Sequence, residues 1–158
     1  MPEAWWNFGV FIFIQLLLFS ILSYYQKKSL VALQVLWRGA LIGFVFGLVL
    51  DHAVGEYFGL TSYVLGFGFF FLCLNALLSY GLFSATILLF QDVQPWLLFV
   101  WSSFIMAVYE IANHFFPVWI WKFPVPPIAF FVVLLVGYFG GALLVVTVAR
   151  FFQKLSLH

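Results

Sequence analysis

The stretch that decides the fold is Gly39–Leu60, which reads GALIGFVFGLVLDHAVGEYFGL. Small residues recur in it at every fourth position, and the series runs Gly39, Gly43, Gly47, Asp51, Gly55, Gly59. Residues four apart lie on one side of an α-helix, so the spacing predicts a helix with one face almost free of side chains. Such a face lets a second backbone approach closely. We predict a close helix–helix contact here, within the bundle or against a partner, although glycine is common in membrane helices generally.

The composition indicates that the surroundings of this helix are lipid. Of the 158 residues, 66% are hydrophobic and only 7% are charged, and the mean hydropathy is +1.18. A soluble domain carries about 25% charged residues, so this chain has too few to cover a surface facing water. The net charge is +1 and no basic patch is large enough to indicate nucleic acid binding. The single Cys73 excludes an internal disulfide and a cysteine-based metal site.

Apolar segments of the length needed to cross a bilayer, about 20 residues, occur five times. They cover about 5–25, 34–55, 60–90, 95–116 and 127–149. The third segment is long enough to tilt strongly or to break at Gly66, Gly68 or Gly81. The connections are short. The predicted fold is therefore an all-α polytopic transmembrane helix bundle of five spans, or six if the third breaks, forming one domain over residues 1–158.

The positive charges predict an orientation in the membrane. If the N-terminus is outside, the cations of the loops and tail face the cytoplasm and Lys122 alone is outside: Lys27, Lys28, Arg150, Lys154. Tryptophans lie near the predicted span ends, where their rings suit the headgroup layer: Trp5, Trp6, Trp96, Trp119, Trp121. We expect a multi-pass protein of the cell inner (cytoplasmic) membrane, with its N-terminus outside and its C-terminus cytoplasmic.

Polar residues gather at the predicted outer ends of the second and fourth spans. The cluster comprises Asp51, His52, Glu56, Glu110, Asn113 and His114. Ionisable groups inside a membrane are costly and indicate a functional site. His52 and Glu56 are four residues apart, as are Glu110 and His114, so each pair shares a helix face. Among isolated polar residues, Gln15, Gln34 and Asn75 are expected to hydrogen-bond between helices.

Three interpretations of this cluster stay open. Two His/Glu pairs could bind a divalent metal, but the Glu-x-x-His pattern of di-iron bundles is absent and no metal or other cofactor is predicted. Asp51 and Glu110 could act as acid–base catalysts on a lipid substrate. Alternatively, the groups pair with one another in the wet interface, where charges cost least. Asp51 is the residue we expect to matter most, because it is the deepest and lies in the glycine register.

The residues Gly43, Gly47, Leu48, Asp51, Gly55, Gly59 and Leu60 make the chain resemble MreD, the rod-shape-determining membrane protein family. That family shows the same G-x3-G-L-x2-D-x3-G-x3-G-L run and a short basic tail, as RFFQKLSLH provides at 150–158. The resemblance implies a non-enzymatic subunit of the cell-elongation machinery whose partners are MreC and a glycan polymerase–transpeptidase pair. It also implies a fold like the S-components of energy-coupling transporters, which bind vitamins.

A second run of residues is similar to the lycopene-cyclase-type membrane domain. Asp51 is followed by Gly59, Leu60, Ser62 and Tyr63, and a basic loop at Lys27–Lys28 precedes the helix. This resemblance implies an enzyme acting on an isoprenoid through carboxylates, although the Pro-x-Glu-Glu stretch of that domain is replaced here by GFGFFFLCLN.

The leading hypothesis is an MreD-like scaffold that docks partner membrane proteins, or a second copy of itself, through the glycine-rich face. The alternative is an enzyme or binder of an isoprenoid or other membrane lipid that uses the outer carboxylates. An S-component-like binder of a small molecule is a third hypothesis.

Overall fold

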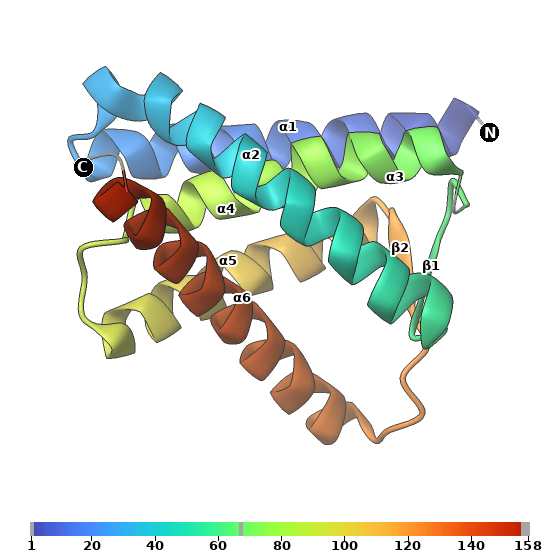
Figure 1. Cartoon of the computed structure of the whole chain (residues 1–158). Helices are drawn as coiled ribbons and strands as arrows, with labels where there is room; N and C mark the ends of the chain where they lie inside the picture. The colour runs from blue at the N-terminus through green and yellow to red at the C-terminus, as the bar shows by residue number, and fades with distance from the viewer. Residues whose placement is uncertain (1, 67, 156–158) are drawn as a thin grey trace.

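The computed structural model describes residues 2–66 and 68–155, and within these residues five helices are long and apolar enough to cross a membrane (Figure 1). The first span is α1 (Pro2–Tyr25). The second is α2 (Ala32–Leu50), which follows the short turn η1 (Ser29–Val31) and continues as the π-helical η2 (Asp51–Tyr57). The third consists of α3 (Phe69–Asn75), the π-helical η3 (Ala76–Tyr80) and α4 (Gly81–Leu88), and the last two are α5 (Pro95–Phe115) and α6 (Pro127–Leu155). The predicted all-α bundle of five spans is confirmed. The last three residues of the predicted basic tail lie outside the described residues.

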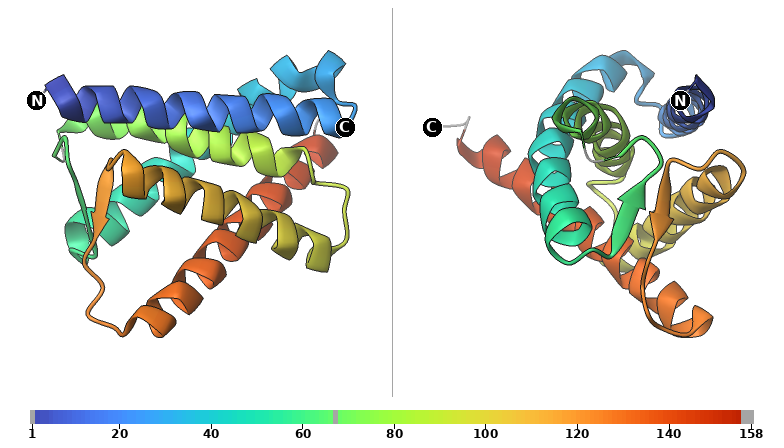
Figure 2. Two further views of the ribbon diagram at one scale, coloured as in Figure 1. Left: turned by 180° about the vertical axis from the view of Figure 1, so that it is seen from behind. Right: turned by 90° about the vertical axis from the view of Figure 1, so that its right-hand side faces the viewer.

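The central element is the third span, α3–η3–α4. It lies beside α1, and the two run in the same direction (Figure 2). It is the most buried of the five spans, and every residue of α4 is buried. The start of this span differs from the sequence prediction. The helix begins at Phe69 rather than near residue 60, and it continues through Gly81 without dividing into two spans.

The residues before α3 are extended instead of helical because they pair with the other loop at the same end of the bundle. Strand β1 (Thr61–Tyr63) lies antiparallel to β2 (Trp119–Trp121), with Ser62 opposite Ile120. Further backbone hydrogen bonds prolong the ribbon: Val64 N donates to Val118 O at 2.9 Å and Lys122 N donates to Leu60 O at 2.8 Å. The ribbon therefore joins the end of α2 to the end of α5.

The glycine face of α2 packs inside the chain. Gly39, Gly43 and Gly47 are buried against η3 and α4. A Cβ atom on Gly39 would lie under 3.0 Å from the backbone of Ala85, and one on Gly43 would lie under 3.0 Å from the backbone of Tyr80. The predicted close contact is thus a contact within the bundle. Gly55 is also buried, but Gly59 is exposed with a φ of +61° and belongs to the turn before β1.

The opposite end of the bundle is held together by basic side chains. Lys28 Nζ donates to Leu89 O at 2.8 Å and pairs with Asp92 Oδ2 at 3.3 Å. Arg150 Nη2, near the end of α6, donates to Gln91 O at 2.5 Å. The loops α1–α2 and α4–α5 and the end of α6 therefore meet at this end, whereas the N-terminus of α1 lies at the ribbon end (Figure 1).

Candidate functional site

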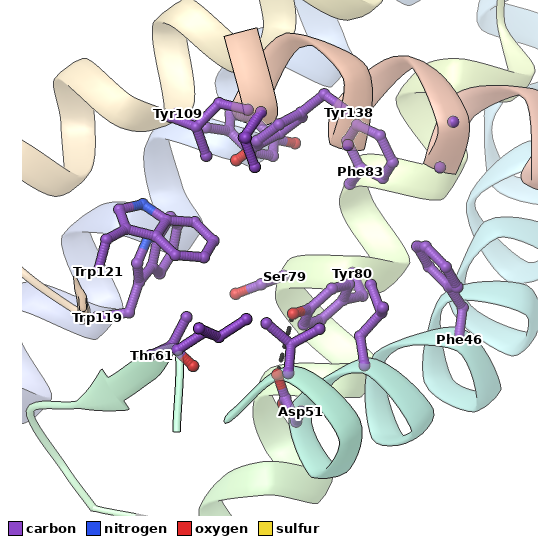
Figure 3. Close-up of a pocket in the computed structure, with 18 of the residues that line it drawn as sticks. Phe46, Asp51, Thr61, Ser79, Tyr80, Phe83, Tyr109, Trp119, Trp121 and Tyr138 are labelled. Carbon is purple, nitrogen blue, oxygen red and sulfur yellow. Dashed lines mark hydrogen bonds between the residues drawn. The ribbon is translucent and has the colours of Figure 1, made fainter. Parts of the chain in front are cut away.

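A pocket of about 460 Å³ lies between α2, the central span, α6 and the ribbon (Figure 3). Its wall is mainly aromatic and aliphatic, and the aromatic residues that line it come from every one of these elements: Phe46, Tyr63, Tyr80, Phe83, Tyr109, Trp119, Trp121, Phe123, Tyr138. This volume falls in the range of about 300–1,000 Å³ found for small-molecule sites. An apolar cavity with a few polar groups is the usual form of such a site.

Asp51 forms the polar floor of this pocket. It is only 2% exposed, and three donors reach its carboxyl group. Tyr80 OH donates to Oδ1 at 2.9 Å, Asn75 Nδ2 donates to Oδ2 at 3.3 Å, and Tyr63 OH also donates to Oδ1. Asn75 Nδ2 additionally lies 3.3 Å from the Tyr63 oxygen. Asp51 is therefore a buried and fully hydrogen-bonded group rather than a solvated side chain at a helix end.

Two π-helical segments bring this floor together. Asp51 is the first residue of η2, whereas Ser79 and Tyr80 are the last two of η3. A π turn holds one residue more than an α turn and occurs often at functional sites. The wider turn of η3 places Tyr80 where its backbone contacts Gly43 and its hydroxyl reaches Asp51. The same segment directs the Ser79 hydroxyl into the pocket (Figure 3).

Tyr63 is the donor that the ribbon contributes to the floor. Burial raises the pKa of its phenol well above the usual value, and its neighbours Tyr80 and Asp51 act in the same direction. The phenol therefore keeps its proton at any physiological pH and remains a donor to Asp51.

The second candidate carboxyl group, Glu110, lies behind the opposite wall. Trp121 Nε1 donates to its Oε2 and Tyr138 OH donates to its Oε1, both at 3.1 Å. Glu110 does not itself line the pocket, but both of its partners do. Its place in the structure is to orient two aromatic side chains of the wall.

The six residues expected to form one polar cluster divide among separate places. His52 and Glu56 form an exposed pair at 2.5 Å, as their spacing predicted. Asn113 is buried and holds the start of β2: its Nδ2 donates to Trp119 O at 3.0 Å, and its Oδ1 accepts from Val118 N and Trp119 N. His114 is exposed, and the donors to Glu110 are Trp121 and Tyr138. No group of three metal-ligating residues occurs among residues 2–66 and 68–155.

The pocket opens along α6. Val136 and Leu144 line it and are 65% and 46% exposed, and the positions of Gly137 and Gly140 leave open space where a side chain would be. On the other side of the opening, Phe46 lies within 3.4 Å of the position of a Cβ on Gly141. Both helices beside the opening, α2 and α6, are long and apolar enough to cross a membrane.

Sequence reasoning found Asp51 but missed most of the groups around it. Trp119 and Trp121, which the sequence places near span ends, are half-buried in the pocket wall, whereas Trp5, Trp6 and Trp96 are exposed. Asn75 does bond between helices, as expected, and Gln34 is exposed. The one local signal for Tyr63 was the turn GLTSY that follows the Asp51 helix.

Comparison of the chain with protein-family models, with curated proteins and with solved structures finds no match. The resemblances to MreD, to S-components and to lycopene-cyclase-type domains therefore stay predictions. The docking surface that the MreD-like hypothesis requires is, however, occupied at Gly39, Gly43 and Gly47 by the chain's own central span.

Proposed function

We propose that this multi-pass membrane protein binds a lipophilic small molecule in the pocket between α2 and α6. The observation that carries the proposal is the combination of an aromatic cavity of about 460 Å³ with a lateral opening on a membrane-facing helix. A ligand dissolved in the bilayer could reach this cavity without crossing water. We favour ligand binding over catalysis because Asp51, the candidate catalytic group in the pocket, already accepts hydrogen bonds from three donors.

The experiment that tests this function is native mass spectrometry of the chain purified in mild detergent after incubation with total membrane lipid. Gly137 shares a helix face with Val133 and Gly141, both of which line the pocket, and a Cβ atom at Gly137 would meet no protein atom within 4 Å. Gly137→Phe is expected to fill the cavity and to reduce bound ligand at least tenfold while the protein stays folded.

The matched control is Leu143→Phe, which adds an aromatic ring to an exposed position of the same helix that does not line the pocket. It is expected to retain the wild-type amount of ligand. Equal ligand occupancy in Gly137→Phe and wild type would contradict the proposal.

We also propose that the ribbon end of the bundle faces the outside and the end held by Lys28 and Arg150 faces the cytoplasm. Four cations gather at the second end: Lys27, Lys28, Arg150, Lys154. Loops rich in lysine and arginine stay on the cytoplasmic side during insertion. A cytoplasm-active reporter fused after His158 is expected to be active and a periplasm-active reporter at the same place inactive. The reverse pattern would overturn the orientation.

A further inference from the structure

Several residues that line the pocket carry a buried polar atom without a hydrogen-bond partner. Among the described residues, both polar atoms of the Gln15 side chain are in this condition, as are Ser79 Oγ, Asn75 Oδ1, Tyr109 OH and Trp119 Nε1. All five residues line the pocket. Gln15 is 1% exposed and Ser79 is 6% exposed, so neither can be satisfied by lipid headgroups or bulk water.

Such groups destabilise a folded protein unless something bonds to them. A buried donor or acceptor that has left water without finding a partner keeps its full desolvation cost. The cost is higher beside lipid, where no competing solvent reaches the backbone or side chains. Five residues with this defect around one cavity point to a bonding partner that binds in that cavity. Because Gln15 offers two donors and one acceptor site, the partner must both donate and accept.

The charges around the pocket restrict the partner further. None of the described residues that line it is a lysine, arginine or histidine, so the anionic head of a phospholipid or a fatty acid would be buried without a counter-charge. Among the described residues that line the pocket, only Asp51 has a carboxyl group, and a cationic head would compete there with the donors Tyr63, Asn75 and Tyr80. A neutral head is the remaining class.

We infer that the ligand is a neutral amphiphile with a hydroxyl or carboxamide head, which bonds to Gln15 and Ser79. Its hydrocarbon part lies against Phe46, Trp121 and Leu144 and extends towards the opening along α6. This inference rests on the proposed function and narrows it to one ligand class.

The test uses four probes built on one C18 chain, which differ only in the head: oleyl alcohol, oleamide, octadecene and oleyl phosphate. An equimolar mixture is offered to the purified full-length chain, and the bound species are counted by native mass spectrometry. The alcohol and the amide are expected to outcompete octadecene and oleyl phosphate about tenfold, the range for one or two neutral hydrogen bonds.

Two variants test whether Gln15 and Ser79 cause the preference for a neutral polar head. Gln15→Met keeps the length of the side chain and removes its polar atoms, and Ser79→Ala removes one hydroxyl. Each is expected to lower the preference for oleamide over octadecene about fivefold or more without lowering octadecene binding. Ser84→Ala is the matched control, because Ser84 Oγ is equally buried and unpartnered but does not line the pocket. It is expected to leave the preference unchanged.

The outcomes separate this inference from the proposed function. Suppose that Gly137→Phe loses binding, but the wild type binds all four probes equally or prefers oleyl phosphate or octadecene. This result would overturn the neutral polar head of the ligand and would still support the lipophilic site. An unchanged preference in both Gln15→Met and Ser79→Ala would also overturn it. Absence of binding of every probe to the wild-type chain, with only water filling the cavity, would overturn both.

Discussion

Gly43→Leu is expected to prevent assembly of the bundle, lowering its stability by at least about 3 kcal/mol, the upper part of the range for overpacked cores. The first carbon of the new side chain would lie under 3.0 Å from backbone atoms of Tyr80 and Gly81. Backbone atoms within a buried helix cannot move aside as a flexible side chain can. The measurement is the fraction of monodisperse protein that survives heating in mild detergent.

Gly9→Leu is the control for this substitution. Gly9 lies on the exposed face of α1, and a Cβ atom there would meet no protein atom within 4 Å. Its thermal midpoint is expected to equal that of the wild type. A Gly43→Leu protein that melts at the wild-type temperature would contradict the close packing of the α2 glycine face against η3 and α4.

Asp51→Leu is expected to destabilise the protein by about 3 kcal/mol or more and to abolish ligand binding. The substitution removes the carboxyl oxygens that accept from the hydroxyls of Tyr63 and Tyr80 and from the amide of Asn75. Each buried donor that loses its partner costs about 1–3 kcal/mol. Asp51→Asn, which keeps one acceptor oxygen, is expected to lie between the wild type and Asp51→Leu. Thermal unfolding and native mass spectrometry on the same samples measure both effects.

Glu56→Gln supplies the comparison, because Glu56 is an acidic residue on the same π-helical segment but its side chain is 44% exposed. Its pair with His52 faces outwards, and exposed pairs contribute little. No change in melting or in ligand binding is expected. If Asp51→Leu and Glu56→Gln behaved alike, Asp51 would not be the floor of a binding site.

The five spans and the close contact along α2 could be predicted from the sequence because both depend on local patterns. The length of an apolar segment determines whether it crosses the bilayer, and Gly39, Gly43 and Gly47 share a helix face whatever lies opposite. What the glycines pack against was left open, since hydropathy does not encode which helix is the neighbour. The start of the third span was misplaced because three-residue strands such as β1 acquire their structure from pairing with β2.

The site was harder to predict than the fold. Asp51 stood out because it occupies a glycine position, but its partners come from β1, α3 and η3 and share no sequence pattern with it. Gln15 and Ser79 carry no motif and become informative only when both are seen to lack a partner beside one cavity. The rotation of each helix about its axis determines which side chains come together at the cavity. The two π turns change that rotation, and helix propensity does not predict where π turns occur.

Tyr80 is fixed from three directions: its carbonyl lies against Gly43, its ring against Gly47, and its hydroxyl on Asp51. The floor of the cavity is therefore preorganised by the same packing that assembles the helices. A guest molecule would meet a surface that needs no rearrangement to receive it, and little conformational entropy would be lost there on association. Selectivity in such a cavity comes from rigidity, because the floor cannot adapt to a molecule of the wrong shape.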